Sequence, residues 1–287
     1  MALEQSLAER LGYGADARLL IVNCDDLGSS HAANVAILRA MESGVATSAT
    51  LMVPCPWARE AARMFEGRDV GVHLTLTAEY RGYRWRSLTG AASLHDDEGF
   101  MPATMAAAAA RATPADVRAE CCAQIDQALA WGVDITHLDS HMGVVQFDAR
   151  FFEIYLDLAA ECRLPLRMVG RGADARLGFD GRRRAAARGI AFPDHLIDSW
   201  PDGVRKAFVE RIASLRPGVS EIFGHPVEDG AELRGYDAEQ PALRAADCAF
   251  FTDPAAARLI ADAAITPISY RPLRDLQRGE RTAVRAL

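Results

Sequence analysis

The chain has 287 residues, half of them hydrophobic and a quarter charged, which is the composition of an ordinary globular protein with a large core. Its formal net charge is −7 at pH 7 without an extended basic segment, so we expect neither nucleic acid nor an anionic membrane as a partner. The six cysteines form no CxxC pair, the N-terminal segment lacks the apolar stretch of a secretory signal, and no apolar run reaches about 18 residues, so we expect a cytoplasmic protein.

The first half of the chain is predicted to alternate strands with helices. Short apolar runs bounded by turn residues predict strands, and apolar residues at helical spacing between a Ser or Thr cap and a Gly predict helices. The predicted strands are 18–23, 45–53, 69–77 and 133–141, and the predicted helices are 31–43, 57–67 and 114–132. Residues 80–113 predict no regular element, and so long an irregular segment is uncommon unless it has a task such as covering a site.

The second half continues the same alternation. The predicted strands are 164–169, 219–225 and 265–270, and helices are predicted at 149–163, within 200–215 and twice within 243–264. Residues 170–200 are polar and predict no regular element. The alternation predicts one α/β domain with a parallel sheet, and the absence of a Gly-x-Gly-x-x-Gly turn after the first strand favours a barrel over an open sheet.

Polar side chains gather where four of the predicted strands end. In parallel α/β folds the carboxyl ends of the strands face the ligand cleft. Four of the seven histidines of the chain lie in these positions. The polar residues at the strand ends are Asp25, Asp26, His73, His137, Asp139, His141 and His225.

The sequence THLDSH places three polar side chains on one face of an extended strand, because side chains alternate between the two faces. His141 is nearest the carboxyl end and is therefore the better candidate for a metal ligand. Asp139 could orient a ligand imidazole by accepting its second N–H, and His137 is expected to be structural. The alternative is a hydrogen-bonded histidine pair around Asp139 without a metal.

Asp25 and Asp26 are two adjacent carboxylates at the end of a buried strand, where they repel each other and are costly to desolvate. A divalent cation would neutralise one of them, and Gly28 indicates a turn that lets both reach the cleft. One could then bind metal while the other acts as a base toward water. The alternative is a pair of acids stabilised by a helix N-terminus.

Two histidines and one carboxylate leave metal positions open for water and substrate, as in metal hydrolases and in non-haem iron oxygenases. Such oxygenases usually have antiparallel β barrels, whereas this chain alternates strand and helix. The single lysine, Lys206, has no P-loop motif around it, which argues against Schiff-base and P-loop chemistry.

Several motifs together resemble the YdjC/ChbG-like carbohydrate deacetylases. They are NCDDLG, VATSATLMV, GVHLTLT, THLDSHMG, LPLRM, HP and ISYRPL, in this order from about residue 18 to residue 273. The resemblance implies an irregular, TIM-like (β/α) barrel that forms a single domain over 1–287, with its core at about 18–273. It also implies a divalent metal and removal of acetyl groups from N-acetylated sugars.

Carried over motif by motif, the resemblance implies that Asp26, His73 and His141 bind the metal. Asp25 resembles the catalytic base and His225 the general acid. Asp139 and Arg167 are expected to orient these groups or to contact substrate. The chain departs from the family pattern at three positions, two of which would line the cleft and leave the exact substrate open: Cys24, Gly143 and Val227.

We therefore expect a small carbohydrate as substrate and one divalent cation as cofactor, with zinc or magnesium as first candidates. The His–His–Asp set also admits manganese, cobalt, nickel or iron. A homodimer is the default expectation for the assembly. Two alternatives stay open: another metal-dependent hydrolase, acting on a phosphoester or a non-sugar amide, and a non-catalytic carbohydrate-binding protein.

Overall fold

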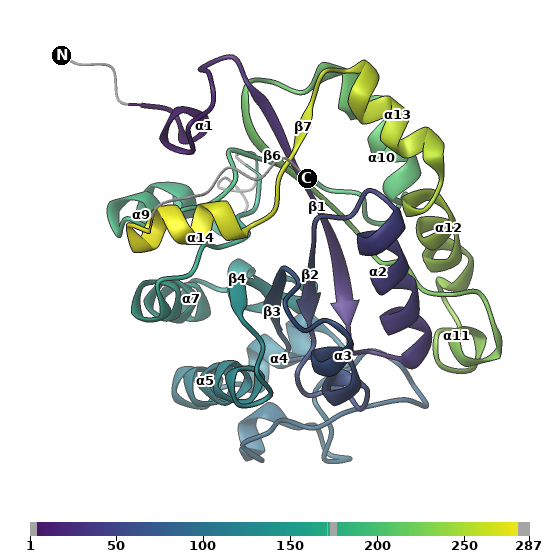
Figure 1. Ribbon diagram of the computed structural model, residues 1–287. Coiled ribbons are helices and arrows are strands. Elements are labelled where there is room, and N and C mark those ends of the chain that lie inside the picture. Colours follow the sequence, from purple (N-terminus) through teal and green to yellow (C-terminus); the bar gives the residue numbers. More distant parts are fainter. Residues whose placement is uncertain (1–4, 171, 173–176, 281–287) are drawn as a thin grey trace.

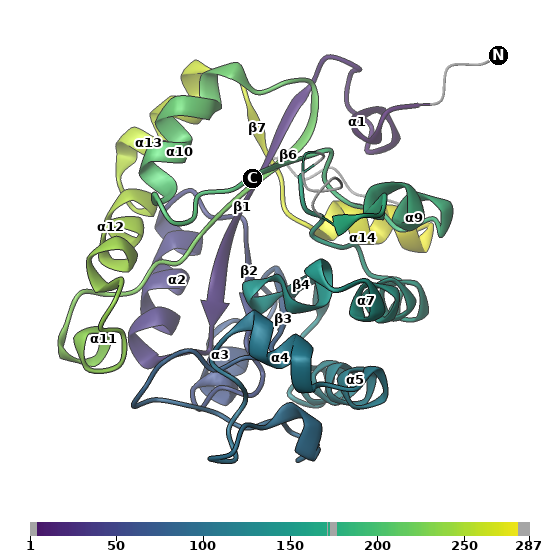
Figure 2. The same ribbon diagram turned by 180° about the vertical axis from the view of Figure 1, so that it is seen from behind.

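A parallel β-sheet lies at the centre of the molecule, and the helices surround it, as Figures 1 and 2 show from opposite sides. The computed structural model describes residues 5–170, 172 and 177–280. The strand order is β4-β3-β2-β1-β6-β5, with β7 paired to β1, and all pairs are parallel. The strands are β1 (Arg18–Leu27), β2 (Ser48–Leu51), β3 (Val70–Leu74), β4 (Ile135–Ser140), β5 (His195–Ile197), β6 (Gly218–Gly224) and β7 (Thr266–Pro267).

Most helices begin where the sequence offers a cap. The Ser30 hydroxyl accepts a hydrogen bond from the Ala33 amide at the start of α2, and the Thr113 hydroxyl does so from Asp116 at the start of α5. The helices are α1 (Leu7–Arg10), α2 (His31–Ser43), α3 (Ala58–Met64), α4 (Met105–Arg111), α5 (Pro114–Ala130), α6 (Val144–Phe147), α7 (Ala149–Cys162), α9 (Gly181–Ala187), α10 (Val204–Arg211), α11 (Ala231–Tyr236), α12 (Pro241–Phe251), α13 (Pro254–Asp262) and α14 (Arg271–Arg278). No helix in the described part of the chain is long and apolar enough to cross a membrane.

The segment 164–169 does not form the full strand that the sequence predicts. It makes one parallel bridge, from Leu166 to Leu138 of β4, and the Leu166 amide donates to the carbonyl of Ala191, shortly before β5. Pro165 has no N–H with which to extend a ladder. The segment nevertheless lies between β4 and the chain leading to β5, so the sheet curls around. The predicted α/β barrel class is confirmed in this irregular, half-barrel form.

The two segments predicted to be irregular contain short regular elements. Residues 80–113 include α4 and a 3-10 turn at Ala92–Leu94, and residues 170–200 include α9 and β5. Within the second segment, 171 and 173–176 lie outside the described residues. The α4 sequence MAAAAAR has high helix propensity but no amphipathic pattern, which is why periodicity missed it. The segment 80–113 crosses the end of the molecule to which the β1 arrow points (Figures 1 and 2).

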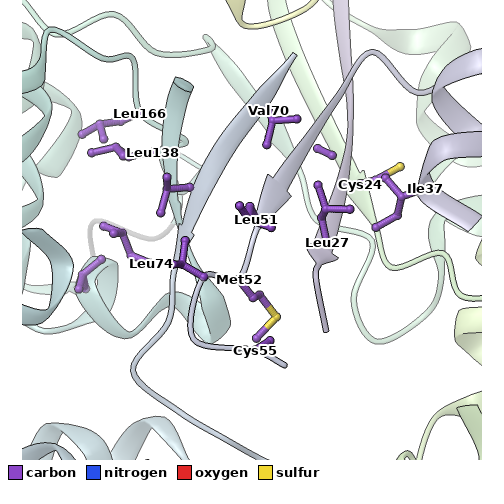
Figure 3. Packing of buried hydrophobic residues seen from close by; sticks show 14 of the residues in the cluster. Cys24, Leu27, Ile37, Leu51, Met52, Cys55, Val70, Leu74, Leu138 and Leu166 are labelled. Carbon is purple, nitrogen blue, oxygen red and sulfur yellow. The ribbon is translucent and has the colours of Figure 1, made fainter. Parts of the chain in front are cut away.

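Alternation along β1 separates two hydrophobic clusters. Leu20, Val22 and Cys24 belong to the larger cluster, whose side chains fill the spaces between the strands and the surrounding helices (Figure 3). Leu19 and Ile21 point the other way and pack in a smaller cluster with residues of α1 and α14. The face of β1 that carries Leu19 and Ile21 continues with Asn23 and Asp25, so it is apolar at its start and polar at its carboxyl end.

Candidate metal centre

The backbone turns at Asp26, which lets two adjacent carboxylates face the same site. Asp26 has φ of 63°, in the left-handed region, and the register between β1 and β2 shifts between Cys24 and Leu27. A non-glycine residue in this region costs roughly 1–2 kcal/mol, which the surrounding contacts must offset. The sequence placed the turn near Gly28, and the structure begins it two residues earlier.

Asp26, His73 and His141 come together from the ends of β1, β3 and β4. The Asp26 Oδ1 atom lies 3.5 Å from His73 Nε2 and 3.2 Å from His141 Nδ1. One ligand atom from each residue lies within 4.8 Å of the others, and all three residues are buried. Two imidazole nitrogens and one carboxylate oxygen in this spacing could hold a single divalent cation.

A carboxylate lies next to the second ring nitrogen of each histidine. His73 Nδ1 lies 2.9 Å from Asp139 Oδ2, and His141 Nε2 lies 3.0 Å from Glu79 Oε2. Such carboxylates fix the ring orientation and tautomer of a metal-binding histidine. The sequence pointed to Asp139 for this task but missed Glu79, which follows the GVHLTLT motif as its next acidic residue.

Arg244 holds the remaining carboxylate oxygen of the group. Its Nη1 donates to Asp26 Oδ2 at 2.8 Å, and its Nε donates to Asp237 Oδ2 at 2.8 Å. Arg244 lies on α12, 218 residues after Asp26, and the sequence pattern gave no sign of it. With Oδ2 bound to the guanidinium, the Oδ1 atom of Asp26 faces the two histidines.

The electrostatics of the group favour a positive charge at its centre. Burial works against the charged imidazolium, but Asp139 and Asp26 raise the pKa of His73 to about 9, and Glu79 and Asp26 raise that of His141 to about 10. Burial also opposes the carboxylate of Asp26, yet both histidines and Arg244 hold its pKa well below the usual range. No hydrogen bond of good geometry from the described residues reaches the buried Asp26 Oδ1, which fits a cation at that position.

A second set of possible ligands lies next to the first but is already occupied by an arginine. Ligand atoms of Asp25, His73 and Asp139 also lie within 4.8 Å of one another. The Arg167 guanidinium donates to both oxygens of Asp25, at 2.6 and 2.7 Å, and lies 2.6 Å from Asp139 Oδ2. Because the Arg167 guanidinium already neutralises Asp25 and Asp139, the group of Asp26, His73 and His141 is the better candidate for a metal site.

Arg167 is the centre of a buried ionic network. Its Nε donates to Glu221 Oε1 at 2.8 Å, and the Tyr270 hydroxyl donates to the other oxygen of Glu221. Burial raises the pKa of Glu221 to about 7, although Arg167 opposes the shift. The Arg167 guanidinium thus fixes the orientation of the Asp25 carboxylate. The sequence predicted neither Glu221 nor Tyr270 as members of this network.

His225 lies beside Asp25, just after the end of β6. Its Nε2 atom is 3.9 Å from Asp25 Oδ2, and its backbone amide donates to Asp247 Oδ2 at 3.0 Å. The imidazole packs against the rings of Trp200 and Phe223. Burial lowers the pKa of His225, so the neutral ring is favoured near pH 7.

His137 lies away from this group, as expected for a structural residue. Its ring stacks on Tyr270 with centroids 3.6 Å apart, and Nδ1 lies 3.0 Å from the Thr136 hydroxyl. Gly71 permits this arrangement, because a Cβ there would come within 2.6 Å of the imidazole.

The three departures from the family pattern lie in different surroundings. Cys24 and Val227 are buried in the larger hydrophobic cluster. Gly143 has φ of 75°, and a Cβ at this position would lie 2.4 Å from the ring of Phe147. The phenyl ring therefore occupies the space next to Gly143 that a larger side chain would need.

Comparison with known proteins gives relatives over almost the whole chain. The model of the family described as YdjC-like protein matches residues 19–262. A carbohydrate deacetylase of Thermus thermophilus is 33% identical over 279 residues, covering 94% of this chain and 98% of that protein. A carbohydrate deacetylase of Geobacillus stearothermophilus is 32% identical over 259 residues, covering 88% and 97%.

A solved structure is similar to the fold described above. It is the crystal structure of an Enterococcus faecalis V583 protein proposed to cleave cellobiose phosphate. The TM-score is 0.79 at 23% sequence identity, covering 90% of this chain and 99% of that chain, so the likeness supports the fold alone. The match to the family model is a match of sequence over residues 19–262, and it confirms the resemblance seen in the motifs. The chain belongs to the YdjC-like family.

Proposed function

We propose that this chain is a metal-dependent hydrolase that removes the acetyl group from N-acetylated sugars. The observation that carries the proposal is the buried group of Asp26, His73 and His141, in which Asp26 Oδ1 has no hydrogen bond of good geometry from the described residues. Asp25 and His225 lie beside this group. The names of the Thermus and Geobacillus relatives point to the same class of reaction.

Asp26, His73 and His141 would hold the cation. Imidazole nitrogens suit zinc and other transition metals better than magnesium, which prefers an all-oxygen shell, so we place zinc before magnesium. A divalent cation bound at this position would polarise a carbonyl group and lower the pKa of water. Asp139 and Glu79 would keep the two imidazole rings in the binding orientation.

Asp25 is the proposed base. Asn23 and Arg167 donate to its carboxylate, which fixes the position of the group without using all of its lone pairs. One of its oxygens lies within 4.8 Å of a ring nitrogen of His73, at the edge of the proposed cation site. Asp25 would accept a proton from the water that attacks the acetamide carbonyl.

His225 is the proposed acid. Because burial lowers its pKa, the ring is neutral before the reaction and must receive a proton before it can donate one. Asp25 Oδ2 lies 3.9 Å from His225 Nε2, so a small side-chain movement that brings the two atoms within hydrogen-bond distance would let the proton taken from water pass between them. His225 would then protonate the leaving nitrogen, which gives acetate and a free amino sugar and returns both residues to their starting states.

Phosphoester hydrolysis is less well supported by the charges at the site. A phosphate needs cationic side chains that are free to bind it. Arg167 is bound by three carboxylates, and Arg244 is bound by Asp26 and Asp237. A non-catalytic sugar-binding role would leave the cost of burying these acidic groups unexplained.

Product analysis tests the proposal directly. Purified protein with a measured metal content is incubated with N-acetylglucosamine and its β-1,4-linked dimer, and in parallel with glucose 6-phosphate. We expect acetate release from an N-acetyl sugar, its loss on treatment with a chelator, and its recovery when zinc is added. Release of phosphate without acetate would support the phosphoester alternative, and chelator-resistant acetate release would contradict the proposed metal role.

A further inference from the structure

An indole ring lies exposed at the edge of the candidate site. Trp200, in the loop between β5 and α10, is 40% exposed, which is unusual because tryptophan is highly buried on average. Its ring centroid lies 5.0 Å from that of His225, with the two planes inclined by 71°. A molecule whose leaving group reaches His225 would therefore also meet the indole.

The position of the indole is tied to the proposed metal ligands as well. The Cζ atom of Arg244 lies 5.8 Å from the centroid of the Trp200 ring, within the range of a cation–π contact. The same guanidinium donates to Asp26 Oδ2. Trp200 thus packs directly on the proposed acid and is separated from Asp26 of the proposed cation site by one side chain, Arg244, and these contacts limit the orientations of its ring.

A small polar cleft begins at the same tryptophan. It has a volume of about 120 Å³. Ligand pockets for larger molecules usually enclose roughly 300–1,000 Å³, so this cleft suits part of a sugar rather than an oligosaccharide. Besides Trp200, it is lined by carboxylate and ammonium groups that can hydrogen-bond to sugar hydroxyls, among them Asp198, Asp202 and Lys206.

We propose that Trp200 is the stacking platform for the sugar ring that carries the acetamido group. A pyranose presents an apolar face of C–H groups, which complements the electron-rich face of an indole, and a rim of hydroxyls for polar partners. The platform selects a sugar over other N-acetylated compounds, whereas Asp25 and His225 act on the acetamide itself. This inference rests on the proposed deacetylase function and adds a residue that determines its substrate.

The test compares Trp200→Ala and Trp200→Phe with a matched control. Trp57→Ala removes a tryptophan that is 37% exposed but packs on His31, outside the candidate site. Loss of aromatic stacking should raise KM for N-acetylglucosamine roughly 2- to 12-fold in Trp200→Ala, with a much smaller change in kcat. Trp200→Phe should recover most of the loss, and Trp57→Ala should keep the wild-type KM.

Product inhibition separates stacking from a merely structural role. Glucosamine should inhibit Trp200→Ala more weakly than the wild type, whereas acetate, which lacks the ring, should inhibit both equally. Wild-type acetate release together with an unchanged KM and unchanged glucosamine inhibition in Trp200→Ala would overturn the platform alone. Failure of the wild type to release acetate from any N-acetyl sugar would overturn the deacetylase function itself. A thermal melt of each variant shows that the comparison is made on folded protein.

Discussion

Replacing Glu221 by glutamine should change how stability depends on pH. Glu221 is fully buried, donors from Arg167 and Tyr270 reach its two oxygens, and burial raises its pKa from 4.5 to about 7. A carboxyl group with a raised pKa keeps its proton in the folded state at pH values where the unfolded chain has lost it. The stability from this group is therefore fully present below pH 4.5 and is lost as the pH rises through about 7.

The size of the effect follows from the two pKa values. With 4.5 for the unfolded chain and about 7 for the folded protein, the group lowers the free energy of unfolding by about 2.5 kcal/mol between pH 5 and pH 8. Glutamine cannot titrate, yet its amide oxygen can still accept from Arg167 and its NH₂ can donate to Tyr270. The Glu221→Gln variant should therefore lack this part of the decline.

Urea unfolding of both proteins at pH 5 and pH 8 measures the difference. All other titrating groups, including the histidines of the candidate metal centre, are shared by the two proteins and cancel when the pH-dependent losses are subtracted. The wild type should lose about 2.5 kcal/mol more than the variant. An equal loss in both proteins would show that Glu221 is ionised in the folded protein over this whole range and would refute the reasoning.

Three further substitutions test individual parts of the site. Asp25→Asn should keep its metal but lower kcat by about 10²- to 10⁴-fold, since it removes the proposed base; near-normal turnover in a steady-state acetate assay would exclude that role. Glu79→Gln should weaken metal affinity by about 10- to 100-fold, because Glu79 orients His141. Equal metal affinity of the wild type and this variant in a chelator competition assay would contradict that role. Gly143→Ala should destabilise the fold by about 1–3 kcal/mol in urea unfolding, through its positive φ and the clash with Phe147. Adding Phe147→Ala should relieve part of that loss, and additive effects of the two changes would argue against the clash.

The parts of the site that follow strand ends could be predicted from the sequence. Parallel strands end at one edge of a sheet, so Asp25, Asp26, His73 and His141 could be placed together from three apolar runs and the polar residues at their carboxyl ends. The structure does bring these residues together. Position along the strand, with His141 nearest its carboxyl end, also distinguished His141 from His137, which stacks on Tyr270 instead.

The partners of these residues could not be predicted, because no local pattern marks them. Arg244 reaches Asp26 from a helix far along the chain, and nothing in the strand sequence GVSEIFG marks Glu221 as a partner of Arg167. The contact between Glu79 and His141 depends on how the chain leaves β3. The helix α4 was also missed, since its alanine run has helix propensity without an apolar stripe. The segment 164–169 was predicted as a full strand, but Pro165 interrupts the ladder and only one bridge forms.

The position of the cation is the most direct test of the proposed chemistry. A crystal grown with zinc, measured on both sides of the zinc absorption edge, locates the ion independently of any activity. We expect one strong anomalous peak within bonding distance of Asp26 Oδ1 and the facing nitrogens of His73 and His141, at roughly 2.0–2.2 Å. A peak between Asp25 and Asp139 with Arg167 displaced would contradict the proposed position of the cation. The absence of any peak in crystals that hydrolyse N-acetyl sugars would contradict the proposed role of the metal.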